Sequence, residues 1–446
     1  MFAPGHLGEL TQIVPFEMVD AVLAETGATE RRVRELPSRV VVYLLLAAGL
    51  FAELGYRQVW ARLVSGLDGP GGVPGGVPWP VPSSSALAQA RRRVGAAPLK
   101  ALFELLAGPP AGAVRWRGLL VCAVDGTTMC VPDSPANLAH YGYQSGSHGG
   151  SGYPLLRLVA VVACGSRTVL GAVFGPLRTG ETTLAPGVFG CLRPGMVLLA
   201  DRNFAVRDLV GQIAATGADL LIRCKNGRVL PRLATLPDGS WTSTLGGARV
   251  RVIDAQITLA LSGGGHKTGR YRLITTLTDH QRHPALEIVE LYHRRWEIET
   301  AYLELKSTTL RGRVLRARTP HGIDQEVYAL LAAYQALRTA MADATATDPA
   351  IDDDRAGFTI ALHTARDQII HAAGVFCGTV IDLVGNIGRA VLAHPLPPRR
   401  TRASPRVVKR AISKHQARGK PDRTNHQAAI TTRILTEPEL TTAQTP

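Results

Sequence analysis

Two short apolar runs that each end in an aspartate constrain the fold of this chain most strongly. Residues 118–124 lead into Asp125, and residues 196–200 lead into Asp201. Apolar runs of this length are typical of strands that are buried on both faces of a sheet. In sheets covered by helices, ligand sites gather at the carboxyl ends of the strands. We therefore expect both aspartates at one edge of an α/β sheet.

Neighbouring segments complete the predicted sheet. Residues 156–163 and 168–174 indicate two strands joined by a turn, and residues 219–223 indicate a fifth strand that follows a helix. Two hairpin strands, one parallel crossover and a strand–helix–strand unit together make a mixed α/β sheet. We assign this core to residues 115–224 and 277–340.

The regions beside the core have different patterns. Residues 1–110 are rich in Leu, Ala and Val and carry several arginines, which predicts an all-α N-terminal domain. Its basic faces fit either a reader of DNA ends or a solvated surface. Residues 225–276 alternate β-branched residues between glycine-rich turns, which predicts a β-rich antiparallel insertion. Further helices are expected over residues 341–398.

The last region, residues 399–446, is expected to be a basic and flexible tail. Its segment 399–423 contains ten Lys or Arg residues against one acid, Asp422. Such runs of like charge are commonly disordered and can lie along phosphates.

The net charge narrows the class of partner. The chain has 50 Lys and Arg against 35 Asp and Glu, a net charge of +15, which favours a polyanion such as DNA, RNA or an anionic membrane surface. Membrane insertion is not expected, because the longest apolar run, residues 40–52, is about two-thirds of the ~20 residues that a spanning helix needs. The six cysteines form no C-x-x-C pair, so neither a zinc site nor a disulfide framework is indicated.

One predicted helix, from Pro284 to about residue 310, carries a spaced set of polar side chains. Tyr292, Arg295, Glu299 and Lys306 are separated by three, four and seven residues. This spacing places all four on one stripe of a helix. Solvated helix faces also carry charge pairs at such spacings, so the stripe alone does not establish a site.

Together with the two strand-end aspartates, the Glu299 of this stripe would form a cluster of three carboxylates. Three carboxylates packed together repel one another unless cations neutralise them. Mg²⁺ suits oxygen ligands, and two such ions about 4 Å apart can activate an attacking hydroxyl and stabilise a leaving oxygen. Arg295 and Lys306 would then meet phosphate. Glu297 and Glu304 lie on another face of the helix and are rejected as ligands, although Glu297 is the natural rival of Glu299.

At these residues the chain resembles the DDE transposases of the insertion-sequence-four family. That family carries the Tyr-Arg-Glu-Lys signature with this spacing, a first Asp often followed by Gly-Thr, as in residues 125–127, and a second Asp after an apolar strand. The resemblance covers roughly residues 8–335. It implies a ribonuclease-H-like mixed-sheet catalytic core with a β-rich insertion, plus an all-α N-terminal domain.

The resemblance also implies roles for individual residues. Two Mg²⁺ ions, for which Mn²⁺ substitutes, would be held by three catalytic ligands: Asp125, Asp201 and Glu299. The DNA backbone near the cleaved end would be contacted by the other signature residues: Tyr292, Arg295 and Lys306.

Two more residues are DNA-binding candidates. Some members of the family that the chain resembles stack a flipped base near the transposon end on a Trp of the insertion. Trp241 is the only Trp of the predicted insertion and is therefore the candidate, although a Trp in a small β domain is more often part of the core. Arg202 follows the second aspartate and would approach DNA, although its position also suits simple entry into a helix.

The function implied is a DNA transposase of the bacterial cytoplasm, associated with the nucleoid when bound to DNA. It would bind the terminal inverted repeats of an insertion sequence as a homodimer, cleave the ends and join them to target DNA, without involving a membrane. One alternative is a catalytically decayed, DNA-binding remnant, against which the six intact signature positions argue. The other is a ribonuclease-H-like nuclease without strand transfer, since cleavage and joining use the same carboxylates.

Overall fold

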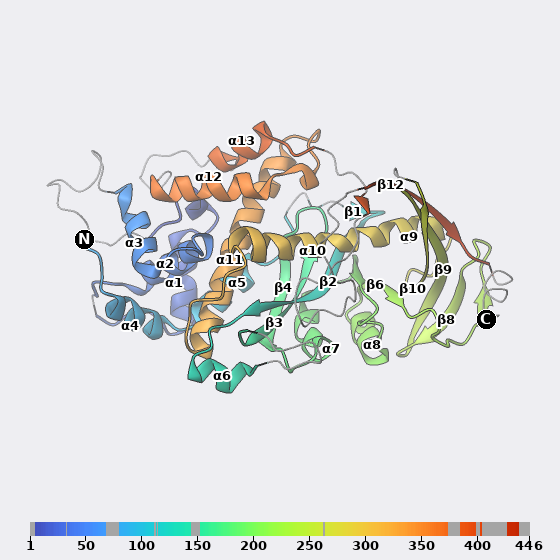
Figure 1. Ribbon diagram of the computed structural model, residues 1–446, viewed down its shortest axis with the longest axis horizontal. Helices are drawn as coiled ribbons and strands as arrows, with labels where there is room; N and C mark the ends of the chain where they lie inside the picture. Colours follow the sequence, from blue (N-terminus) through green and yellow to red (C-terminus); the bar gives the residue numbers. More distant parts are fainter. Residues whose placement is uncertain are drawn as a thin grey trace.

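The computed structural model describes residues 5–32, 34–67, 80–110, 113, 115–143, 152–261, 264–372, 384–397, 402–403 and 426–436. Figure 1 shows a mixed α/β molecule in which the N-terminal helices lie at one end and a group of long strands at the other. A central sheet and a long helix connect the two ends. Most of the predicted basic tail lies outside the described residues.

The predicted five-stranded mixed sheet is confirmed. Its strands are β2 (Leu119–Cys130), β3 (Leu155–Ala163), β4 (Val169–Pro176), β5 (Met196–Ala200) and β6 (Asp219–Cys224). They lie in the order β6-β5-β2-β3-β4. β2, β5 and β6 are parallel, whereas β3 is antiparallel to both of its neighbours. This is the arrangement expected of a ribonuclease-H-like core.

Alternation along β2 explains why this strand is apolar throughout its first half. Val121 and Ala123 enter one hydrophobic core, whereas Cys122 and Val124 enter a second core on the opposite face of the sheet. Successive side chains of a strand point to opposite faces, so a strand covered on both sides needs an apolar residue at every position. The second core is closed by α8 (Arg207–Ala215).

The register of the sheet places the two aspartates side by side. Ala123 of β2 pairs with Leu199 of β5, so the same offset brings Asp125 level with Asp201. The expectation that Asp125 ends its strand is wrong, because β2 continues to Cys130 alongside β3. β5, by contrast, ends directly before Asp201. The site edge is therefore the place where β5 stops and β2 continues.

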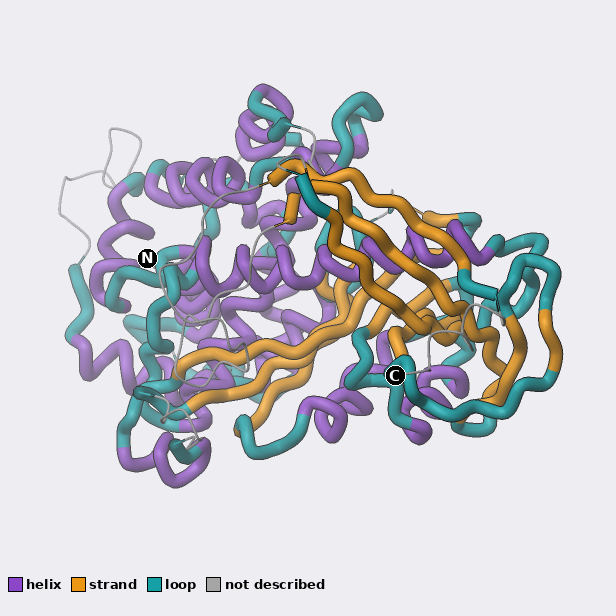
Figure 2. The backbone as a smooth tube through the Cα atoms, turned by 45° about the vertical axis from the view of Figure 1, so that its right-hand side comes forward, coloured by secondary structure: helices purple, strands orange, loops and turns teal. Residues whose placement is uncertain are grey.

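The β-rich insertion extends the core sheet. β7 (Ala234–Thr235), β8 (Trp241–Leu245), β9 (Ala248–Leu261) and β10 (His266–Thr275) pair antiparallel in sequence order. β10 also pairs with β6, so the insertion and the core share one continuous sheet, as Figure 2 shows.

The expectation of a flexible tail is wrong for part of residues 399–446. β12 (His426–Ile434) pairs with β9 over seven residues, and β11 (Arg402–Ala403) pairs with β12. The sequence interpretation rested on the Lys and Arg run, whereas β12 follows that run and contains β-branched residues such as Ile430 and Thr432. Ile434 packs against the large core, which fixes the strand.

Helices form the other half of the molecule. The N-terminal ones are α1 (Phe16–Glu25), α2 (Ser38–Leu50), α3 (Tyr56–Ser65), α4 (Ser84–Val94) and α5 (Ala97–Leu106). α2 and α5 pack against α11 (Pro320–Ala346), and Gly49 permits the close approach of α2, because an added Cβ would lie 3.3 Å from the Ala329 carbonyl oxygen. α11 crosses the domain limit drawn at residue 340.

Smaller helices complete this half. α6 (Pro135–Tyr141) follows β2, while α12 (Phe358–Ile370) and α13 (Gly385–Ala393) cover α11, as Figure 1 shows. Within the described segments, no helix has both the length and the apolar character that crossing a membrane requires.

Candidate active site

The helix that carries the signature is a succession of helical segments. It comprises α9 (Ala285–Tyr292), a 3₁₀ turn (His293–Arg295), α10 (Trp296–Leu303) and a π-helical turn (Glu304–Thr309). The 3₁₀ turn tightens the path and the π turn widens it. The signature side chains still meet the same edge of the sheet, as their contacts with β2 and β5 show.

Two of these contacts fix the ends of the stripe. The Tyr292 hydroxyl donates a 3.1 Å hydrogen bond to the carbonyl oxygen of Ala200, the last residue of β5. Lys306 Nζ donates a 3.1 Å hydrogen bond to Oγ1 of Thr127 on β2. The stripe therefore spans the gap where β5 ends beside β2.

Arg295 joins two of the predicted ligands. Its Nη1 lies 3.3 Å from Oδ2 of Asp125, and its Nη2 lies 3.1 Å from Oε1 of Glu299. The residue is only 8% exposed, and its Nε has no hydrogen-bond partner among the described residues. The Glu299 side chain is 40% exposed, so this bridge runs from the sheet edge towards solvent.

The half-buried position of Asp125 makes its negative charge costly. Burial, with added repulsion from Glu181 and Asp201, raises the pKa of Asp125 to about 7, although the backbone N–H of Gly126 and the Arg295 guanidinium oppose the shift. The Gly126 N–H donates to Oδ1 at 2.8 Å. A nearby cation would favour the ionised form.

Asp201 has a local structural role as well as its place at the site edge. Its Oδ1 accepts a 2.7 Å hydrogen bond from the backbone N–H of Asn203, which closes the turn after β5. Arg202 is exposed and lines a pocket of about 670 Å³ whose other basic residues include Lys225 and Arg228. A basic pocket therefore opens directly beside the predicted ligand.

The donor set fits a divalent cation in its chemistry. It consists of carboxylate oxygens, which hard cations such as Mg²⁺ and Mn²⁺ prefer. In the part of the chain that the structure describes, however, no three His, Cys, Asp or Glu side chains already converge closely enough to hold a metal ion. A metal ion held at this edge would therefore require the carboxylates to draw together.

The structure argues against the predicted base-stacking role of Trp241. This residue is 4% exposed and belongs to the second core, and its Nε1 donates a 3.3 Å hydrogen bond to Asp254. Arg232 lies over the ring at 4.7 Å from its centre and Arg272 at 5.8 Å. A base would have to displace these neighbours, so the prediction is corrected to a core role.

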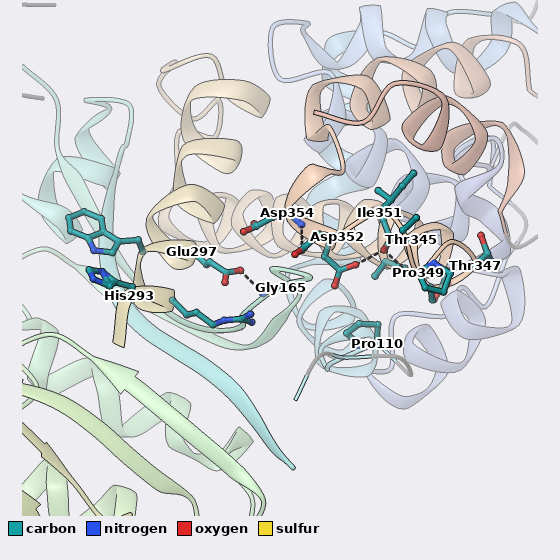
Figure 3. Close-up of a pocket in the computed structure, with 17 residues that line it drawn as sticks. Pro110, Gly165, His293, Glu297, Thr345, Thr347, Pro349, Ile351, Asp352 and Asp354 are labelled. Carbon is teal, nitrogen blue, oxygen red and sulfur yellow. Dashed lines mark hydrogen bonds between the residues drawn. The ribbon is translucent and has the colours of Figure 1, made fainter. Parts of the chain in front are cut away.

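Glu297 and Glu304 face away from this edge. Glu297 accepts a hydrogen bond from the backbone N–H of Gly165 and lines a separate pocket of about 840 Å³ with Asp352 and Asp354, as Figure 3 shows. None of the three predicted ligands lines that pocket. Glu304 is buried and bonds to Arg167, Tyr334 and Arg338. Both residues have structural partners.

Two residues near the site were missed by the sequence interpretation. The Tyr302 hydroxyl donates to the Asp125 carbonyl oxygen at 2.6 Å and accepts from the Ala160 N–H at 3.1 Å, so it ties the signature helix to β2 and β3. Its position three residues after Glu299, on the same helix face, was the available signal. Glu181 is the second, and its signal was weaker: one acidic residue at the start of a short helix.

Comparison with known families decides the identity. Residues 4–104 match the insertion element 4 transposase N-terminal family, and residues 116–336 match the transposase DDE domain family. The chain belongs to the insertion-sequence-four family of DDE transposases. It is therefore a DNA transposase, an enzyme that acts on DNA and uses a divalent metal.

Individual relatives agree with this family. The chain is 26% identical over 404 residues to the transposase InsG for insertion sequence element IS4 of Escherichia coli (strain K12), covering 88% of this chain and 90% of the relative. It is 32% identical over 203 residues to the putative transposase InsZ of the same strain, covering 44% and 64%.

A solved structure also shares some likeness with this transposase. The cryo-EM structure of the piggyBac transposase synaptic complex with hairpin DNA covers 91% of this chain and 87% of its own, with 9% identity and a TM-score of 0.40. A likeness this distant adds nothing to the family assignment, which rests on the sequence matches.

Proposed function

We propose that Asp125, Asp201 and Glu299 hold two Mg²⁺ ions, for which Mn²⁺ substitutes, and that this site performs the cleavage and strand transfer of the transposase. The observation that carries the proposal is the meeting of three elements at one edge. Asp125 on β2 is level with Asp201 after β5, and Arg295 of the signature helix bridges Asp125 to Glu299.

The chain's own residues have distinct parts in this reaction. When bound, the metal ions supply a more nucleophilic hydroxyl and stabilise the leaving oxygen. By holding the positive charge of the metal ions at the sheet edge, Asp125 and Asp201 fix the position of the reacting phosphate. Arg295 releases its carboxylates and offers its planar fork to a phosphate, while Lys306 offers a point charge and Tyr292 a hydroxyl beside β5.

The reaction consists of two phosphoryl transfers. In hydrolysis, water attacks the phosphorus at the element end and the 3′ oxygen leaves, taking a proton to become a free hydroxyl. In strand transfer, that hydroxyl attacks a phosphorus of target DNA and releases a new 3′ hydroxyl. Each step breaks one P–O bond and forms another, so one set of carboxylates serves both.

The DNA substrates are the terminal inverted repeats and the target. Arg202 and the basic pocket beside it lie within reach of a strand that enters the site. The active form is a homodimer on DNA in the bacterial cytoplasm, at the nucleoid. Because phosphate contacts release counterions, the affinity for end DNA should fall steeply as salt rises.

The test is Mg²⁺-dependent cleavage of DNA that carries the repeats flanking the gene. Intact protein is compared with Glu299→Gln and with Glu290→Gln, an exposed control on α9. We expect end-specific cutting and joining by the intact protein and the control, and binding without cutting by Glu299→Gln. Equal cutting by Glu299→Gln removes Glu299 from the site. Cutting without joining indicates a nuclease, and binding without cutting by every protein indicates a decayed remnant.

A further inference from the structure

Glu181 brings a fourth carboxylate to the edge where Asp125 and Asp201 meet. It is the first residue of α7 (Glu181–Leu184), which follows β4. Its side chain reaches back over β2, since a Cβ placed on Gly126 would lie 2.1 Å from Glu181 Oε1. The Glu181 carboxylate therefore occupies the space where residue 126 would carry a side chain, at the position that follows Asp125 on β2.

Asn203 connects Glu181 to the second aspartate. Its side-chain Nδ2 donates a long hydrogen bond, 3.5 Å, to Oε2 of Glu181, and its backbone N–H donates to Oδ1 of Asp201 at 2.7 Å. One residue of the turn after β5 thus orients carboxylates from two different elements. Both carboxylates are held by neutral donors.

The charges around Glu181 are unfavourable without a cation. Asp201 repels its carboxylate, and the Glu181 charge in turn repels Asp125. Among the described residues no ion pair to Glu181 falls within 4 Å, and Arg157 acts on it only at longer range. A half-buried carboxylate beside two others, with no cation against it, destabilises the protein alone.

We propose that Glu181 contributes a carboxylate oxygen to the divalent-metal site, as its fourth acidic residue. This inference rests on the proposed function, since it places Glu181 at the site of Asp125, Asp201 and Glu299. It also gives a reason for Gly126 in the Asp-Gly-Thr segment: any side chain there would displace the Glu181 carboxylate from its present position.

The first test measures metal binding rather than activity. Mn²⁺ affinity is followed by electron paramagnetic resonance in the full chain bound to a duplex carrying the flanking repeats. The variants are Glu181→Gln, Glu299→Gln and the control Glu290→Gln. We expect Glu181→Gln to weaken Mn²⁺ binding about tenfold to a hundredfold, as loss of a ligand-supporting group does in other metal sites, and Glu290→Gln to match the intact protein.

The outcomes separate this inference from the site on which it rests. Weak Mn²⁺ binding by Glu299→Gln together with intact binding by Glu181→Gln overturns the role of Glu181 and leaves the three-carboxylate site standing. Unchanged binding in both variants overturns the site itself, and the role of Glu181 with it.

A second test uses Gly126. Its φ is not in the left-handed region, so Gly126→Ala meets no backbone strain, and the three atoms nearest to the added methyl all belong to Glu181. We expect Gly126→Ala to weaken Mn²⁺ binding about tenfold in the intact chain and to have no further effect in a Glu181→Ala background. Equal losses in both backgrounds would show that residue 126 acts without Glu181 and would overturn the proposal.

Discussion

The two faces of the signature helix hold similar acidic residues in opposite electrostatic conditions. On the inner face, Glu304 is buried and is bound by two arginines, Arg167 and Arg338, and by the Tyr334 hydroxyl. At the sheet edge, Arg295 is the cation within 4 Å of Asp125 and Glu299 in the described structure. Glu304 is therefore matched by cations of the chain, whereas the carboxylates at the edge outnumber the cations near them.

This difference in the number of nearby cations helps to separate carboxylates that stabilise the fold from those that are candidates for function. Glu304 serves the fold and is neutralised within the chain, since an uncompensated buried charge would destabilise the native state. Asp125, which we propose to bind an external cation, has Arg295 as its ion-pair partner in the described structure, and burial raises its pKa to about 7. Substitutions at the sheet edge should therefore mainly lower the rate of DNA cleavage, whereas substitutions on the buried face should mainly lower stability.

The largest expected effect is at the edge. We predict that Asp201→Asn lowers the rate of end cleavage by at least about 10⁴-fold, as removal of a residue that acts as part of a catalytic unit does. Stability should be unchanged, since an Asn oxygen can still accept the hydrogen bond from the Asn203 N–H. Single-turnover cleavage and urea denaturation measure the two quantities. A large loss of stability would assign Asp201 to the turn alone.

On the opposite face the effect should be on folding. Glu304→Gln leaves Arg338 and Arg167 without their shared carboxylate, so we expect the free energy of unfolding to fall by about 3–5 kcal/mol. Urea denaturation tests this, with Glu290→Gln as the exposed control. If Glu304→Gln unfolds like the intact protein, the contrast between the faces fails.

Arg295 should respond to a change that keeps its charge. Arg295→Lys retains a cation but loses the fork that reaches Asp125 and Glu299 together. We expect cleavage to fall about tenfold to a hundredfold while the affinity for end DNA changes less. Parallel measurements of the cleavage rate and of DNA binding decide this, and full activity of the Lys variant would show that the fork is dispensable.

The smallest predicted effect is a pH dependence of stability without metal. Because the pKa of Asp125 is raised to about 7, the native state binds its proton more tightly than the unfolded chain does. Stability from this group is therefore present at low pH and is lost as pH rises from the ordinary carboxyl range towards 7. The Tm of the intact protein should fall by a few degrees relative to Asp125→Asn between pH 5 and pH 8. Parallel Tm profiles would contradict the shift.

The parts of the molecule that the sequence predicted are those with a local pattern. The apolar runs before Asp125 and Asp201 predicted buried strands, and helical spacing predicted that Tyr292, Arg295 and Lys306 would face one way. These patterns depend on near neighbours in sequence, which the chain shows directly.

The parts that were missed depend on long-range contacts. Glu181 reaches the edge only because the turn after β4 directs it over Gly126, and no periodicity reports that contact. Trp241 was assigned to DNA from the family resemblance, as the only Trp of the insertion, but its surroundings include Arg232 and Asp254, which lie outside its own strand. The pairing of β12 with β9 joins segments about 170 residues apart.

That pairing has a consequence for how the protein is made. The outer half of β9, from Ala255 to Leu261, gains its second neighbour only after β12, about 170 residues later in the chain, has been synthesised. Until then it presents an unpaired strand edge, which can recruit another chain. A variant that lacks β12 would keep Asp125, Asp201 and Glu299 and would expose this edge of β9, so we expect it to aggregate more readily than the intact protein.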